Sequence, residues 1–288
     1  MAVTALGYIG LHVSDLDAWC SYATGVLGLE LSGREEGLAY LRMDELHHRI
    51  ILHEDSRDDL AYAGWQTPNR DAFEATLGLM TAAAISFTPA TEEERAQRMV
   101  QAMAKFELSG VPMEVFYGPK VLFDKPFQPS ARMSGFRTGD MGMGHIAFAG
   151  DDPQELARLM IEGLGFEVGD SFSGFECLLR CNRRENTVFI PAGPFSGGKR
   201  LNHFMLETKA LDDVGSCFDR CEDNGVEVTS RIGRHTNDLS LSFYMRTPSG
   251  FRVEYGWDSK STDIGDWPVR EYERSSVWGH RPPVQTTS

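Results

Sequence analysis

Several features that would place a chain in other classes of protein are scarce or absent here. The 288 residues include only five cysteines, an odd and sparse set that excludes a disulfide framework and fits a reducing cytoplasm. No apolar run approaches the ~18 residues that a membrane-spanning helix needs, and the N-terminal sequence lacks the basic and apolar segments of a signal peptide. Lysine and arginine number 28 against 42 aspartates and glutamates, and this net charge of −14 disfavours nucleic acid as a partner.

What the sequence does contain is an internal repeat. Residues 8–30 (YIGLHVSDLDAWCSYATGVLGLE) resemble residues 145–167 (HIAFAGDDPQELARLMIEGLGFE) at an offset of 137, without a gap. Two further matches follow in the same order: residues 60–67 with 201–208, and residues 109–118 with 249–257. Three matches in one order indicate that the chain is a duplication.

The repeat also predicts the fold class. Each copy begins as an alternating strand, enters a helix at an acidic residue and leaves it at Gly28 or Gly165, where a helix C-cap belongs. Short strands with two helices per half predict an α+β fold, with paired βαβββ modules forming a curved mixed sheet in each of two tandem domains. A Pro/Ser/Gly-rich stretch separates residues 1–134 from residues 135–288. Thr91–Phe106 is expected to be a polar surface helix that opens with a capping box.

Three repeat-equivalent strand positions carry metal-ligand chemistry in only one half. The second half has His145, His203 and Glu254 where the first half has Tyr8, Tyr62 and Glu114. Two imidazoles and one carboxylate on one face of a cation are typical of non-haem iron(II) oxygenases, because three positions stay open for a bidentate substrate and O₂. Phenols are poor ligands of iron(II) unless they are ionised. The sequence therefore predicts iron in the second half only, with His47, His48 and His53 as surface or edge residues of the metal-free half.

Motifs along nearly the whole chain carry a family resemblance: LGYIGLHVSDLDAW from Leu6, MGHIAF around His145, KRLNHFMLE around His203, GRHTND from Gly233, SFYMRTPSG from Ser242 and VEYGW from Val253. The sequence resembles the type I extradiol ring-cleavage dioxygenases, the 2,3-dihydroxybiphenyl 1,2-dioxygenase family of the vicinal oxygen chelate superfamily. The resemblance implies an Fe(2+) enzyme that opens a catechol ring beside its two hydroxyls with O₂, in the degradation of aromatic compounds. It also implies a metal-free N-terminal domain, a catalytic C-terminal domain and a homo-oligomer, often an octamer.

The resemblance implies roles for further residues of the second half. His235 is expected near a substrate hydroxyl, and Tyr244 is expected to donate a hydrogen bond to the substrate or to oxygen. Asn237 and Asp238 flank His235 and are candidate substrate-binding residues, although a turn with local side-chain hydrogen bonds explains them equally well. Pocket size is expected to depend on a few apolar residues: Ala147, Phe189 and Phe195.

One position departs from the family pattern. Where the family commonly reads Cys-Asn-x-Arg-His-His-Ser, this chain reads CNRRENT from Cys181, so Asn186 replaces the acid/base histidine. An amide donates a hydrogen bond but transfers no proton near pH 7. Three explanations stay open: a slow dioxygenase, a proton from another group, or an activated substrate. Glu185 would point the opposite way in an extended segment, which favours a substrate with an extra hydroxyl or another electron-releasing group.

Two other functions remain open from the sequence. Some relatives in the superfamily only bind small molecules in the same cleft, so a non-catalytic binding protein is the main alternative. A glyoxalase-type isomerase would usually need two carboxylate ligands, and the second half supplies one. The sequence names neither the native catechol nor the role of His280 near the C-terminus.

Overall fold

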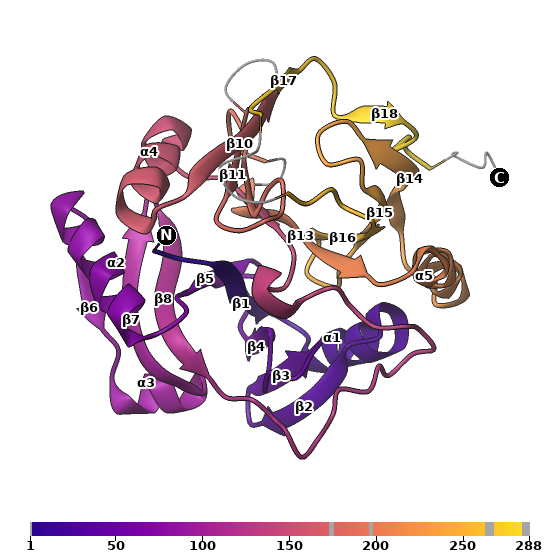
Figure 1. Cartoon of the computed structure of the whole chain (residues 1–288). Helices are drawn as coiled ribbons and strands as arrows, with labels where there is room; N and C mark the ends of the chain where they lie inside the picture. Colours follow the sequence, from indigo (N-terminus) through magenta and orange to yellow (C-terminus); the bar gives the residue numbers. More distant parts are fainter. Residues whose placement is uncertain (1, 173–175, 196–197, 263–267, 284–288) are drawn as a thin grey trace.

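The computed structural model describes residues 2–172, 176–195, 198–262 and 268–283. The first half of the chain forms an eight-stranded sheet in the order β2-β3-β4-β1-β5-β8-β7-β6 (Figure 1). The second half forms a ten-stranded sheet in the order β17-β10-β11-β12-β9-β13-β16-β15-β14-β18. The α+β class and the two mixed sheets expected from the repeat are confirmed.

The elements fall into four βαβββ modules, two in each sheet. The first half of the chain contains β1 (Ala5–Val13), α1 (Leu16–Tyr22), η1 (Ala23–Leu27), β2 (Glu30–Glu35), β3 (Leu38–Arg42) and β4 (Ile50–Glu54), then β5 (Leu60–Gln66), α2 (Arg70–Ala82), β6 (Phe87–Pro89), α3 (Glu92–Gln97), β7 (Val100–Leu108) and β8 (Val111–Pro119). The second contains η2 (Gly139–Met141), β9 (Ile146–Phe148), α4 (Pro153–Leu164), β10 (Glu167–Phe172), β11 (Glu176–Arg180) and β12 (Val188–Ile190), then β13 (Leu201–Thr208), α5 (Leu211–Asp223), β14 (Val228–His235), β15 (Leu241–Arg246), β16 (Arg252–Trp257), β17 (Glu271–Tyr272) and β18 (Ser276–Trp278). No described helix is long and apolar enough to cross a membrane.

The first helix of each repeat begins and ends as the sequence indicates. The side chain of Asp15 accepts a hydrogen bond from the backbone N–H of Ala18, and Asp152 caps α4 in the same way. Gly28 and Gly165 end the two helices with φ angles of 79° and 75°, left-handed conformations in which a Cβ is unfavourable. The two copies therefore turn from helix to strand by the same local chemistry.

The predicted helix over Thr91–Phe106 is wrong after Gln97. Thr91 and Glu94 do form the expected capping box, but α3 ends with Gln97 and the chain continues as β7. From Val100 to Leu108, the even-numbered residues are all apolar, and most of the odd-numbered residues are polar. This period of two is typical of a strand, and it outweighs the helix signal of the preceding acidic turn.

The two halves pack into one continuous hydrophobic core. The indole N–H of Trp19 in α1 donates to the hydroxyl of Ser249 at 2.8 Å. The hydroxyl of Tyr255 in β16 donates to the backbone carbonyl of Leu27 at 3.1 Å. Residues of β16, in the second sheet, are thus anchored on the helical segment of the first module.

A buried charge cluster occupies the centre of the first sheet. Arg98 donates two hydrogen bonds to the carboxylate of Glu114, at 3.1 and 3.0 Å, and both side chains are buried. The hydroxyl of Tyr8 donates to the same carboxylate at 2.6 Å, and the Arg98 guanidinium lies 3.9 Å from the ring centre of Tyr62. The three repeat-equivalent residues therefore do meet, and a guanidinium supplies the positive charge among them.

The histidines of this half are less exposed than expected. His48 is buried, with 5% of its surface exposed, because its ring packs between Tyr8 and Tyr40. His53 is half-buried, and its Nε2 lies 2.6 Å from the hydroxyl of Tyr62. The expectation of a surface position is wrong for His48.

Arg98→Met should destabilise the protein strongly, because it leaves the buried Glu114 carboxylate without its cation. Breaking one side of a buried pair costs ~3–5 kcal/mol, whereas removing both charges is close to neutral. Urea unfolding should therefore show a large loss for Arg98→Met and substantial recovery for Arg98→Met combined with Glu114→Gln. Arg34→Met is the control, because its pair with Asp17 is solvent-exposed and exposed ion pairs contribute little to stability. Equal losses for Arg98→Met and Arg34→Met would contradict the assignment.

Candidate metal centre and active-site cavity

Three neighbouring strands in the middle of the second sheet bring the predicted ligands together. Met205 of β13 pairs with Glu254 of β16, and its backbone N–H donates to the carbonyl of His145, directly before β9. Residues directly opposite one another on paired strands face the same side of a sheet, and so do residues two apart on one strand. His145, His203 and Glu254 consequently project from the same face.

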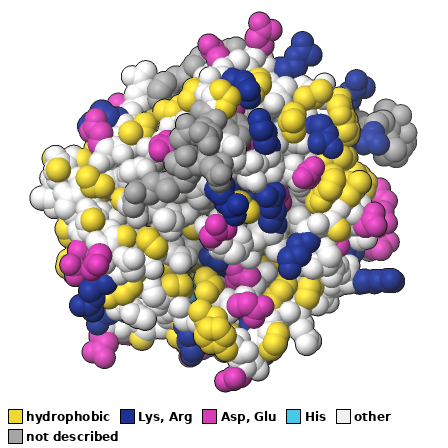
Figure 2. Space-filling view, in the orientation of Figure 1, with side chains coloured by type: hydrophobic (Ala, Val, Ile, Leu, Met, Phe, Trp, Pro, Cys, Tyr) yellow, Lys and Arg dark blue, Asp and Glu magenta, His cyan; other side chains and the backbone are white. Residues whose placement is uncertain are grey.

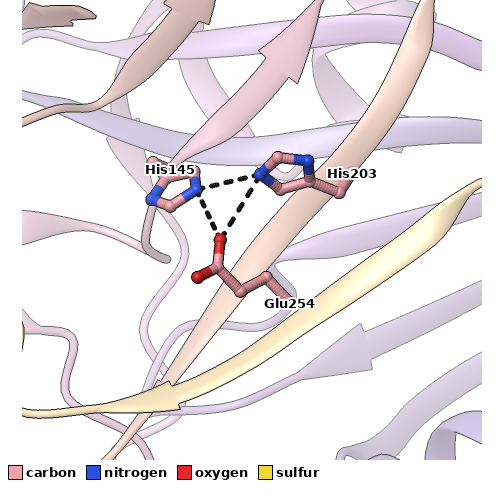
Figure 3. A group of neighbouring side chains, drawn as sticks. All are labelled: His145, His203 and Glu254. Carbon is pink, nitrogen blue, oxygen red and sulfur yellow. Dashed lines mark hydrogen bonds and ion pairs between the residues drawn. The ribbon is translucent and has the colours of Figure 1, made fainter. Parts of the chain in front are cut away.

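The ligand atoms of the three side chains form a compact triangle (Figure 3). The Nε2 atoms of His145 and His203 lie 3.2 Å apart, and Oε2 of Glu254 lies 3.0 Å from the first and 3.4 Å from the second. Ligand atoms about 2.1 Å from one cation and at right angles to each other lie about 3.0 Å apart. Within the described residues, no other group of His, Cys, Asp and Glu side chains brings three ligand atoms this close.

The two oxygens of Glu254 have different surroundings. Oε1 accepts a hydrogen bond from the hydroxyl of Ser242 at 2.6 Å and lies 3.2 Å from Nε2 of His235. Among the described residues, Oε2 faces only the two ligand imidazoles and has no other donor. A buried carboxylate oxygen that points at two imidazole nitrogens without a hydroxyl or amide donor fits a metal ligand.

The protonation states suit metal binding. Burial lowers the pKa of His203 to about 4, so its imidazole is neutral near pH 7. Its Nδ1 lies 2.7 Å from Oδ1 of Asn202, an acceptor that holds the proton on Nδ1 and leaves the Nε2 lone pair facing the site. Burial alone would raise the pKa of Glu254, but the charge and hydrogen bond of His145 hold it well below its ordinary value.

A cavity of about 430 Å³ opens beside the triangle. One part of its wall is apolar and comes from β10, β11, β12 and the segment that follows: Phe172, Leu178, Phe189 and Phe195. The polar part consists of the three candidate ligands with Asn186, Asn202, Ser230, His235, Asn237, Asp238, Tyr244, Arg252, Ser275, Ser276 and His280. The cavity can therefore pack an aromatic ring against phenylalanine side chains while polar groups hold its oxygen atoms near the metal position.

Most of the predicted site residues line this one cavity. They are Asn186, His235, Asn237, Asp238 and Tyr244, together with Phe189 and Phe195. Ala147 does not line the cavity among the described residues: it is fully buried within β9, where it pairs with Phe189 and His203. Both partners line the cavity, so Ala147 lies beside its wall, and its contact with the substrate stays a prediction.

His235 and Tyr244 form a hydrogen-bonded pair next to Glu254. Nε2 of His235 lies 2.9 Å from the hydroxyl of Tyr244, and its Nδ1 lies 2.9 Å from the backbone carbonyl of Ser275. Burial alone would lower the pKa of His235, but the hydrogen bond and charge of Glu254 raise it to about 9. A divalent cation on the same carboxylate would oppose that increase. Burial, and then the charge of Glu254, raise the pKa of Tyr244 well above its ordinary value, so the phenol remains a donor.

Asn186 and Glu185 face different surroundings, although residues 181–187 form mostly bends before β12 rather than the extended segment that was expected. Asn186 lines the cavity, whereas Glu185 is 1% exposed and accepts a hydrogen bond from the amide of Asn237. Burial, and then the charge of Asp238, raise the pKa of Glu185 well above its ordinary value. Glu185 is thus a buried acid one residue away from Asn186, and it contacts the cavity-lining residue Asn237.

Other residues of the site were not found from the sequence. Asn202 and Arg252 form a hydrogen bond with each other beside His203, and the Arg252 guanidinium lies 5.0 Å from the ring centre of Tyr244. Asn202 directly precedes the candidate ligand His203, and this position was the sequence signal that could have identified it. Ser242 lies two residues before Tyr244 in β15, so the alternation of side chains along the strand could have placed it on the same face. No local sequence pattern indicates that residues 275–280 line the cavity, because their position depends on the long-range pairing of β18 with β14.

Comparisons with known proteins agree with this geometry. Residues 6–54 match the family model for dihydroxybiphenyl dioxygenase BphC D1, and residues 142–255 match the glyoxalase/bleomycin resistance protein/dioxygenase superfamily. The chain is 40% identical to a biphenyl-2,3-diol 1,2-dioxygenase of Sphingomonas paucimobilis over 97% of this chain and 95% of that protein. It is 37% identical to a 1,2-dihydroxynaphthalene dioxygenase of Sphingobium xenophagum, over 99% and 97% of the two chains.

A crystal structure of catechol 2,3-dioxygenase superposes with a TM-score of 0.91 at 38% identity, over 99% of this chain and 97% of that one. Identity at this level over the full length, the shared fold and the His-His-Glu metal site all indicate the same family. The chain belongs to the 2,3-dihydroxybiphenyl 1,2-dioxygenase family of extradiol ring-cleavage dioxygenases, within the superfamily that also contains the glyoxalases.

Proposed function

We propose that the metal of this ring-cleavage enzyme is iron(II), and that its native substrate is a catechol with an additional hydroxyl or another electron-releasing group. The observation that carries the proposal is the triangle of His145, His203 and Glu254 at the edge of a cavity with an aromatic wall. Two neutral nitrogens and one carboxylate leave an iron(II) ion with a net charge of +1 and three open positions. When bound, the iron supplies a Lewis acid that holds both substrate oxygens and O₂ together.

The protein's own residues would bind, orient and move protons. The phenylalanine-rich wall packs the ring and excludes water from one side of the cavity. His235 stands beside Glu254 with its Nε2 towards the cavity. A cation held by Glu254 would lower the pKa of His235, and the neutral imidazole could then accept the proton that a catechol hydroxyl loses on binding. Tyr244 stays protonated and donates a hydrogen bond to substrate oxygen. Asn186 orients by hydrogen bonding alone, because an amide does not titrate near neutral pH.

Two features bear on the size and the polarity of the substrate. The relatives are named for biphenyl-2,3-diol and 1,2-dihydroxynaphthalene, which are aromatic diols larger than catechol itself. The cavity also presents polar side chains away from the triangle, including Ser230 and Asn237, which can hold a further hydroxyl. An ionised extra hydroxyl would supply electron density to the ring and remove the need for an acid/base histidine at residue 186.

The family resemblance is the basis for a proposal about the oligomeric state of the protein and its location in the cell. We propose a homo-oligomer that works in the cytoplasm. All five cysteines are free, which suits a reducing compartment. Apolar side chains gather at the edge where β14 and β18 lie (Figure 2), and exposed Leu239 and Trp278 belong to that region. Exposed apolar patches of this kind mark association surfaces.

Anaerobic loading with iron(II) should yield one tightly held iron per chain. His203→Ala and Glu254→Gln should lose that iron and with it ring cleavage, because each removes one of three ligands. Tyr62→Phe is the matched control at the equivalent position of the first sheet, and it should retain full iron content. Elemental analysis with oxygen consumption measures both properties. Two tightly held irons per chain, or full activity in His203→Ala, would contradict the assignment.

Tyr244→Phe should leave iron content near that of the wild type while slowing turnover. The change deletes one hydroxyl and keeps the ring, and losing a proton-transfer or oxyanion partner typically costs ~10- to 1000-fold in rate. Steady-state kinetics normalised to iron give the answer. Loss of iron with normal turnover per iron would mean that Tyr244 supports the metal rather than the substrate.

Asn186→His should improve cleavage of simple catechols, such as biphenyl-2,3-diol, more than cleavage of catechols with an extra hydroxyl. The introduced imidazole titrates near neutral pH and supplies the proton transfer that an unactivated ring needs. A panel of substituted catechols, scored by new visible absorbance and oxygen uptake, measures the ratio. Rapid cleavage of simple catechols by the wild type, unchanged in Asn186→His, would show that residue 186 takes no part.

A further inference from the structure

The last described segment of the chain returns to the active-site cavity. β18 pairs antiparallel with the end of β14, with His235 opposite Ser276 and Arg234 opposite Trp278 (Figure 1). His280 follows this strand and lines the cavity. Its approach requires a glycine at position 233, because a Cβ there would lie 2.3 Å from the His280 backbone nitrogen and 2.6 Å from its ring.

Four contacts fix the His280 imidazole. Its ring lies over His235, with 4.2 Å between ring centres and 35° between ring planes. Its Nδ1 lies 2.7 Å from the hydroxyl of Ser276, and its Nε2 lies 3.2 Å from both the hydroxyl and the backbone carbonyl of Ser242. A carbonyl only accepts, so the proton belongs on Nε2, and Nδ1 accepts from Ser276.

These hydrogen bonds run in one direction towards the metal site. Ser276 donates to His280, His280 donates to Ser242, and Ser242 donates to Oε1 of Glu254. The chain of donors occupies Oε1 and leaves Oε2 towards the two ligand histidines. The same segment fixes His235, because the carbonyl of Ser275 accepts from its Nδ1 and therefore keeps its Nε2 directed at Tyr244 and Glu254.

We propose that His280 is a positioning residue of the active site, which holds the ring plane of His235 and the hydroxyl of Ser242 in the arrangement that substrate binding requires. The inference rests on the proposed role of His235 at a substrate hydroxyl. His280 acts through two residues at once, by stacking on one and donating to the other. An imidazole suits the position because it offers a flat face and a directed N–H together.

The first test compares His280→Ala with His280→Phe, which keeps a flat ring but has no N–H. His280→Ala should lower kcat for biphenyl-2,3-diol ~10- to 100-fold, the range expected when a reacting group is displaced. It should also weaken anaerobic binding of the diol and reduce the ultraviolet signal of its bound anion, a readout that needs no turnover. His280→Phe should recover part of both losses. Iron content and thermal midpoint should match the wild type in both variants, and Glu273→Ala, an exposed change in the same segment, should change nothing.

The second test asks whether His280 acts through His235. The double variant His235→Ala/His280→Ala should lose clearly less than the product of the two single losses, because the contribution through His235 is lost only once and only the contribution through Ser242 is added. Wild-type kcat and diol binding in His280→Ala, with His235→Ala impaired, would overturn the inference and leave the proposed function standing. A full additional loss in the double variant would also overturn it. Normal turnover and diol binding in His235→Ala would instead reject the proposed role of His235, and the inference with it.

Discussion

Glu114 and Glu254 are buried at equivalent positions of the two sheets, and a buried carboxylate requires a positive partner. Around Glu114 that partner is the guanidinium of Arg98, held by two hydrogen bonds and lying on the face of Tyr62. Around Glu254 the neighbours are two imidazoles in the geometry of a metal site. The same βαβββ pair thus meets one electrostatic requirement in two ways. A fixed organic cation makes a filled centre, whereas an exchangeable metal leaves open positions for chemistry.

The cavity is arranged around this requirement. Part of its polar side contacts Glu254 directly, as His235 does, or contacts it through Ser242, as His280 does. Its apolar side comes from strands β10, β11 and β12, in the module that also supplies His145, and from the segment after them. Substrate shape is therefore set largely by strands that carry none of the three ligands. Variation in those strands can account for relatives that are named for different aromatic diols.

The sequence predicted the parts of this structure that occur in both copies of the repeat. The ligand positions, the acidic N-caps and the glycines that end α1–η1 and α4 follow from comparing one half with the other. The family resemblance added residues without such a counterpart, including His235 and Tyr244, which line the cavity. Contacts that depend on long-range pairing without a motif were missed. Arg98 follows a six-residue helix that was expected to continue, and its contact with Glu114 depends on the pairing of β7 with β8. The role of His280 depends on β18, whose three residues carry no pattern that indicates a partner strand.

The hydrogen bond from Tyr255 to the carbonyl of Leu27 ties the two copies together at a sensitive point, because Tyr255 directly follows the ligand Glu254. The hydrogen bond from the indole of Trp19 to Ser249 and the shared hydrophobic core act in the same way, so the second copy packs on the first as its support. Among the described residues, the first copy holds no group of three metal-ligand atoms, yet it contacts the residue next to a ligand in the second. A chain without the first copy would lose part of the support of Glu254 along with apolar packing. Selection on the metal site therefore extends to residues of the first half that lie far from the metal position in the sequence.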